Sequence, residues 1–133
     1  MSSVTRTCLS LSTLAVLGIA AGAIAAPQPG RWTGQIETGT SNRIAVTLTI
    51  QDGQRGSLLF GAPASCDVPL TIVGEQNGAT LYSMEPNRSS GVFCDMQTGG
   101  QAQLRPDGNG GFLLVMAAGQ RNAHYAGRLT PAR

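Results

Sequence analysis

The amino-acid sequence predicts a small all-β domain built as an antiparallel meander. Its 133 residues leave room for one domain and not two. Residues 44–51 alternate apolar and polar side chains, which is the period-two pattern of a half-buried strand. The chain also holds 18 glycines, and its turn signals recur about every dozen residues. This combination is typical of short strands joined by tight turns and not of a helical bundle.

Nine segments are candidate strands, and no helix of useful length is expected between them. They are residues 32–37, 44–51, 57–60, 68–76, 80–85, 91–97, 101–105, 112–117 and 123–130. A meander removes its exposed edges by closing into a barrel, and about eight strands enclose an interior that side chains can fill. Because such closure needs an even number of antiparallel strands, one of the nine is wrong or bulged. A two-sheet β-sandwich is the alternative.

The N-terminal segment, residues 1–25, has the organisation of a secretory signal peptide. Residues 1–7 carry the positive charge, residues 8–24 are apolar, and Ala23-Ile24-Ala25 supplies the small residues of a cleavage site. We expect a single exported domain over residues 26–133, with no membrane span after cleavage. Its destination would be the periplasm of a bacterium or the outside of the cell.

The three cysteines predict one disulfide. Cys8 would leave with the signal peptide, so the exported domain keeps Cys66 and Cys94. An even pair of cysteines in an exported domain is typical of a disulfide. On the chain-entropy account, such a bridge contributes roughly 3–4 kcal/mol to the free energy of unfolding. Two cysteines do not complete a structural zinc site, which uses four protein ligands, and no metal is expected.

The charge pattern argues against a nucleic-acid-binding protein. All nine basic side chains are arginine. Without Arg6 of the signal peptide, eight arginines face seven acidic residues, so the net charge is 8 − 7 = +1. No basic run occurs, whereas nucleic-acid-binding domains cluster their basic residues on one face.

The two ends of the domain carry a pattern seen in known barrels. Gly30-Arg31-Trp32 near the start, with Arg128 on the last candidate strand, resembles the signature of the calycin-type barrels. These are the lipocalins, the avidins and the bacterial metalloprotease inhibitors. The resemblance implies that Trp32 packs near the base of a closed barrel, under Arg128, and that both residues support the fold. Cys66 comes later in the chain than the pattern of the protease inhibitors implies.

Successive turns of a meander alternate between the two ends of the barrel, and the predicted turns differ in length. Four are tight, at residues 52–53, 77–78, 98–100 and 119–122, and four are longer, at residues 38–43, 61–65, 86–90 and 106–111. Binding residues concentrate on loops held by a rigid scaffold, so the longer set is the predicted binding rim, braced by the disulfide. It offers seven candidate binding residues: Asn42, Arg43, Pro63, Asn87, Arg88, Asp107 and Asn109. Arginine is enriched at interface hot spots, which favours Arg43 and Arg88.

No catalytic motif is recognised, and we expect no enzyme and no cofactor. His124 is the only histidine, and no nucleophile is paired with it in the sequence. Four acids, Asp67, Glu75, Glu85 and Asp95, could in principle pair for glycoside hydrolysis. A domain this small rarely forms the long cleft that such a substrate needs.

These observations favour an exported binding module that acts through its loop-rich end. It would be either an inhibitor of a partner protein or a carrier of a small apolar ligand. A structural envelope protein without a ligand and a small hydrolase are the alternatives. The interior of the barrel distinguishes the inhibitor from the carrier. A hollow barrel would favour a carrier of a small ligand, and a filled one would favour a protein partner at the rim. Five leucines are expected to point inward: Leu48, Leu70, Leu81, Leu104 and Leu114.

The first prediction concerns the exported form. We expect a mature protein that begins at or near Ala26 and has no free thiol, because the cleavage pattern ends at Ala25 and the remaining cysteines form a pair. N-terminal sequencing and thiol titration of exported material measure both properties. A retained leader, or two titratable thiols in the folded protein, would contradict the prediction.

Overall fold

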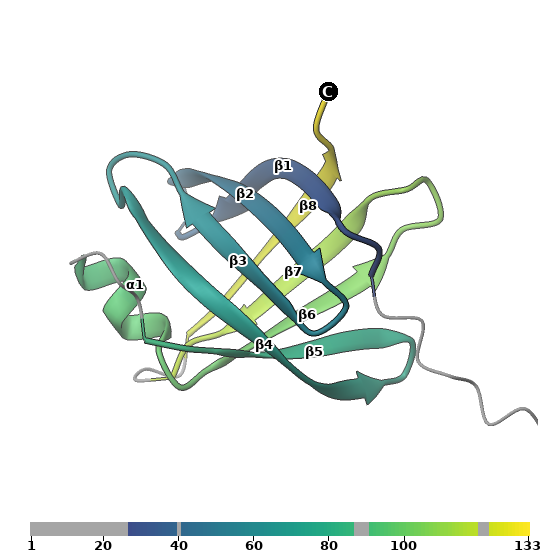
Figure 1. Ribbon diagram of the computed structural model, residues 1–133. Helices are drawn as coiled ribbons and strands as arrows, with labels where there is room; N and C mark the ends of the chain where they lie inside the picture. Colours follow the sequence, from purple (N-terminus) through teal and green to yellow (C-terminus); the bar gives the residue numbers. More distant parts are fainter. Residues whose placement is uncertain (1–26, 40, 87–90, 120–122) are drawn as a thin grey trace, which may run out of the picture.

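Eight antiparallel strands, connected in chain order, close into a barrel (Figure 1). The computed structural model describes residues 27–39, 41–86, 91–119 and 123–133. The elements are β1 (Gly30–Glu37), β2 (Arg43–Asp52), β3 (Arg55–Phe60), β4 (Cys66–Gln76), β5 (Ala79–Met84), α1 (Val92–Gln97), β6 (Gln101–Pro106), β7 (Phe112–Ala117) and β8 (His124–Pro131). The predicted all-β meander barrel is confirmed, and the sandwich alternative is set aside.

The barrel closes where the first strand pairs with the last. β1 and β8 are antiparallel over the register from Trp32↔Pro131 to Glu37↔Ala126. Two glycines allow the close approach at this seam: a Cβ on Gly34 would collide with the carbonyl oxygen of Arg128, and one on Gly127 with that of Gln35. Because the sheet has no edge strand left to pair with another chain, closure also protects against edge-to-edge association.

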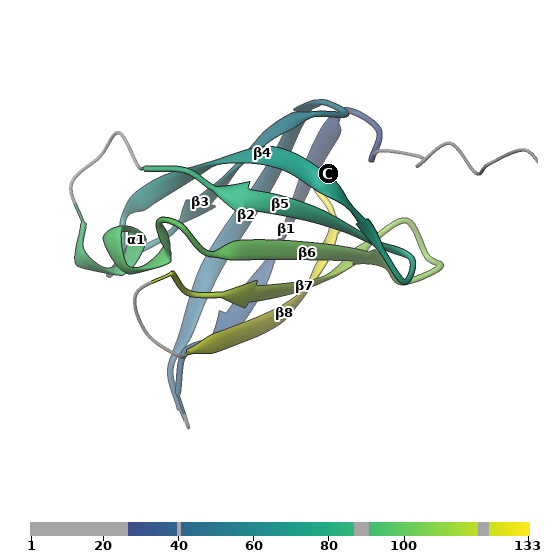
Figure 2. The same ribbon diagram turned by 90° about the horizontal axis from the view of Figure 1, so that it is seen from below.

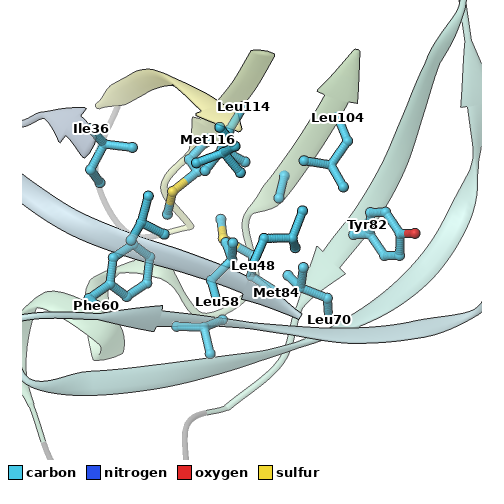
Figure 3. Close-up of a cluster of buried hydrophobic side chains, with 14 of the residues drawn as sticks. Ile36, Leu48, Leu58, Phe60, Leu70, Tyr82, Met84, Leu104, Leu114 and Met116 are labelled. Atoms are coloured by element: carbon cyan, nitrogen blue, oxygen red, sulfur yellow. The ribbon is translucent and has the colours of Figure 1, made fainter. Parts of the chain in front are cut away.

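The interior of the barrel is filled by apolar side chains. Every strand contributes inward residues that are fully or almost fully buried, and they form one cluster. Figure 3 labels ten of them, namely Ile36, Leu48, Leu58, Phe60, Leu70, Tyr82, Met84, Leu104, Leu114 and Met116. An eight-stranded barrel has an interior that side chains can just fill or that can hold one small ligand. Here buried apolar side chains from all eight strands point into that interior.

One of the five leucines expected inside points outward. Leu81 is half-buried on the outer face, and its neighbour Tyr82 lies in the core instead. The register explains the correction. Leu70 of β4 faces Met84 of β5 in the interior, and the alternation along β5 then turns Tyr82 inward and Leu81 outward.

One of the nine candidate strands, residues 91–97, is wrong, because residues 92–97 form α1. Phe93, Cys94 and Gln97 face the barrel, while Val92 is 78% exposed. Residues one and four positions apart can share one broad face of a helix. In a strand, the adjacent Phe93 and Cys94 would point to opposite faces. Among the described residues no helix is both long and apolar enough to cross a membrane.

This correction changes which loops share an end of the barrel. The β1–β2, β3–β4, β5–β6 and β7–β8 connections lie at one end together with α1, which we name the helix end (Figures 1 and 2). The β2–β3, β4–β5 and β6–β7 hairpins lie at the other, the hairpin end. Because residues 91–97 do not cross the barrel, the β6–β7 loop at 107–111 joins the tight hairpins and not the predicted binding rim.

Trp32 lies at the hairpin end, where it helps to close the interior. Its indole packs edge-on against Phe112, with ring centroids 5.0 Å apart, and its Nε1–H donates to the carbonyl oxygen of Gly110 at 2.9 Å. Arg128 is exposed on the outer face of β8, next to the inward Leu129. The expected packing of Trp32 under Arg128 is therefore not found, because the two side chains lie on opposite faces of the barrel wall.

Tyr82 places a polar atom inside the core. The residue is fully buried, and its hydroxyl has no hydrogen-bond partner among the described residues. Burial, with a smaller contribution from the negative charge of Asp52, raises the pKa of this phenol above its ordinary value of 10.0. The folded protein therefore holds the phenolic proton to a higher pH than the unfolded chain does.

The second prediction tests Trp32. Trp32→Ala removes the contact with Phe112 and the hydrogen bond to Gly110, so we expect the free energy of unfolding to fall by about 3–5 kcal/mol. Denaturant unfolding followed by circular dichroism measures the change. Leu59→Ala is the control, because Leu59 is 53% exposed on the outer face of β3. An unchanged midpoint in Trp32→Ala would contradict its role in the core.

The third prediction tests Tyr82. An unpaired buried hydroxyl costs about 1–3 kcal/mol, so Tyr82→Phe should be at least as stable as the natural protein at neutral pH. As the pH rises above 10.0, the natural protein should lose stability, because the unfolded chain releases the Tyr82 proton first. Tyr82→Phe should lack this component. Urea titrations at neutral and alkaline pH measure both effects, and a less stable variant at neutral pH would show that the hydroxyl is paired.

Candidate functional site

The helix end is organised by a disulfide. Cys94 of α1 is bonded to Cys66, the first residue of β4, with the two Cα atoms 6.2 Å apart. The predicted pairing is thus present, and both cysteines are buried. The bond joins the only helix of the described chain to the end of a barrel strand. It therefore sets where α1 can lie.

Aromatic packing holds the same helix over the mouth of the barrel. The ring of Phe93 lies 5.0 Å from that of Phe60 on β3 and 5.6 Å from that of Tyr125 on β8. The buried Gln97 donates from Nε2 to the carbonyl oxygen of Phe93 at 3.1 Å. The two ring contacts tie α1 to β3 and β8, and the Gln97 hydrogen bond lies within the helix. Tertiary contacts therefore hold this six-residue helix over the mouth of the barrel.

An apolar groove of about 510 Å³ runs between α1 and the β3–β4 loop. Its walls are Ile44, Pro63, Ala64, Gly91, Val92, Phe93 and Met96, and none of these side chains is charged. Val92 stands at its border with 78% of its surface exposed, the largest exposure among the large apolar side chains described. Exposed apolar side chains gathered at one place are typical of interaction sites.

The predicted binding residues divide between the two ends. Asn42 and Arg43 are exposed at the helix end, and Pro63 lines the groove. Arg43 makes a contact of 3.4 Å from Nη2 to Oε1 of Glu37, and both side chains are about two-thirds exposed. A pair this exposed contributes little to stability, so Arg43 remains available to a partner.

Two predicted binding residues, Asn87 and Arg88, lie outside the described residues. Two others, Asp107 and Asn109, lie at the hairpin end. There, Oδ1 of Asp107 accepts hydrogen bonds from the backbone N–H groups of Asn109, at 2.7 Å, and of Gly111, at 3.0 Å. This is the turn-forming role of an aspartate. The structure therefore does not bring Asp107 and Asn109 together with the other candidates.

Of the seven groove residues only Pro63 is among the sequence candidates, and three of the six others, Val92, Phe93 and Met96, lie on α1. These three were missed because residues 91–97 were interpreted as a strand, in which no pair of adjacent residues faces inward. The adjacent Phe93 and Cys94, followed by Gln97, form the helical spacing that could have revealed them. Their chemistry fits binding of an apolar surface. Among the described residues no group of three or more histidine, cysteine or acidic side chains could hold a metal ion.

The sequence matches no model of a known protein family and no curated protein. An eight-stranded barrel by itself does not identify a calycin-type protein, because closed barrels of this size also occur in other groups. The resemblance of Gly30-Arg31-Trp32 and Arg128 to that group stays a hypothesis.

Proposed function

We propose that this protein is an exported binding module that binds a partner protein in the groove at the helix end. The observation that carries the proposal is the groove itself: an apolar surface bordered by the exposed Val92 and held in place by the disulfide and by Phe93. An apolar groove with positioned walls gives a partner a surface that needs little rearrangement on binding, which favours affinity.

The filled interior supports a protein partner over a small ligand carried inside. Leu48, Leu58 and Leu104 are fully buried at its centre. A carrier of the lipocalin kind needs an internal space, and a ligand here would have to displace packed side chains. Loss of the contacts of one large buried side chain lowers the free energy of unfolding by several kcal/mol. A small ligand that displaced such side chains would have to compensate for this loss.

Arg43 supports a protein partner as well. It follows the β1–β2 loop and adjoins Ile44, which lines the groove. An exposed arginine at the same end of the barrel as an apolar groove fits the enrichment of arginine at interface hot spots. Export is part of the same proposal, since disulfides such as Cys66–Cys94 persist in oxidising compartments.

The fourth prediction tests the groove. Val92→Asp places a charge where the partner would exclude water, and we expect a loss of about 2 kcal/mol in binding free energy, roughly a thirtyfold loss of affinity. The mature protein is first used to isolate its partner from the envelope of the producing cells. The affinity of the purified partner for each variant is then measured by calorimetry.

Val73→Asp is the matched control, because it also introduces an aspartate at an exposed apolar position, 57% exposed, but on the part of β4 that leads to the hairpin end. Both variants should keep the unfolding midpoint of the natural protein, so that binding is compared at equal stability. Equal affinities for Val92→Asp and the natural protein would refute the groove as the binding site. Co-purification of a stoichiometric apolar small molecule would favour the carrier instead.

A further inference from the structure

Strand β7 is apolar on both faces. Phe112, Leu114 and Met116 are buried inside the barrel. The outward residues are Leu113, which is 39% exposed, and the half-buried Val115 and Ala117. Of the eight described strands, β7 alone has only apolar residues on its outer face. A strand that faces water normally alternates with polar residues, and one that is apolar on both sides is typical of a strand covered on both.

The apolar surface continues across the neighbouring strand. Val115 lies opposite Ala126 of β8 in the ladder. Beside Ala126 lies a hollow of about 380 Å³, which marks the polar limit of this surface, since it is lined by Gln35, Glu37, Arg43 and Arg128 as well as by Ala126 and Gly127. We name the surface formed by Leu113, Val115, Ala117 and Ala126 the β7 wall. It lies on the side of the barrel and reaches the helix end only at Ala117, the last residue of β7.

Two arginines border this surface in register with Leu113. Arg105 of β6 lies opposite Leu113 on one side, and Arg128 of β8 lies opposite it on the other. Arg105 donates from Nη1 to the carbonyl oxygen of Asn77 at 2.7 Å. Neither guanidinium has a carboxylate partner within the described part of the chain. The row is thus positive, apolar, positive, and the complementary surface is negative, apolar, negative.

We infer that the β7 wall is a second interaction surface, for an acidic amphipathic helix of a partner protein. Neighbouring strands lie about 4.8 Å apart, so the backbones at Arg105 and Arg128 are about 10 Å apart, with Leu113 midway. In a helix, residues i and i+7 are about 10.5 Å apart along the axis, and residue i+3 or i+4 lies between them on the same face. Carboxylates at i and i+7 with an apolar residue between them match the row.

Two other occupants fit less well. A second copy of this chain, related by a two-fold axis, would set the same arginine row against itself, and like charges facing each other repel. An anionic membrane is bound by clusters of about four to eight basic residues, and the β7 wall has two. A carboxylate-bearing protein segment neutralises both guanidiniums and covers Leu113 at once.

The test, which is also the fifth prediction, uses a photoreactive amino acid in place of Val115 in the full chain, expressed in the cells that produce it. We expect a protein adduct whose crosslinked peptide, mapped by mass spectrometry, has acidic residues seven positions apart around an apolar one. Charge reversal in Arg105→Glu with Arg128→Glu should lower the adduct yield at least tenfold. Leu113→Asp gives a second variant in case the double variant is unstable.

Arg31→Glu with Arg55→Glu is the matched control, since it changes the same net charge at exposed arginines of the hairpin end, and it should keep the adduct. Val92→Asp should keep it as well, which would separate this surface from the proposed groove. The inference is overturned by an adduct with lipid or with a second copy of the chain, by no adduct, by insensitivity to the charge reversal, or by loss of the adduct in Val92→Asp.

Discussion

Pairing of β1 with β8 is the constraint on which the rest of this structure depends. Without this pairing the chain would form a twisted open sheet with two free edges. Such a sheet encloses no interior into which side chains could point. Gly34 and Gly127 permit the close backbone approach at this seam. Once the seam is closed, the side-chain alternation of every strand is set relative to one interior.

Closure of the barrel and the buried side chains inside it are the reason that binding is proposed at the outer surface. An eight-stranded barrel is narrow, and this one is packed with leucine, methionine and aromatic side chains down to a fully buried tyrosine. Its variable parts are therefore the connections and the outward residues. The groove beside α1 and the β7 wall are two places where several outward apolar side chains gather, whereas the exposed Leu59 and Val73 lie on other strands.

The helix shows how a short element acquires a defined place. Six residues are too few for a stable isolated helix. Cys94 is bonded to β4, Phe93 packs between Phe60 and Tyr125, and Gln97 is buried beneath. These tertiary contacts make residues 92–97 helical, and they also turn Val92 away from the barrel to border the groove.

Much of the fold was determined by the sequence alone. Alternation along residues 44–51, the turn at Asn77-Gly78 and the even cysteine pair are local signals, and they predicted the strands, the hairpin and the disulfide. The tertiary structure decided that residues 91–97 are a helix, because that choice depends on contacts with β3, β4 and β8. It thereby decided which loops share an end, separating Asp107 and Asn109 from Arg43 and Pro63. The spacing of apolar residues in a segment shows how its side chains alternate, but not which other elements the segment packs against. Both candidate surfaces are formed by such packing between elements that are distant in the sequence.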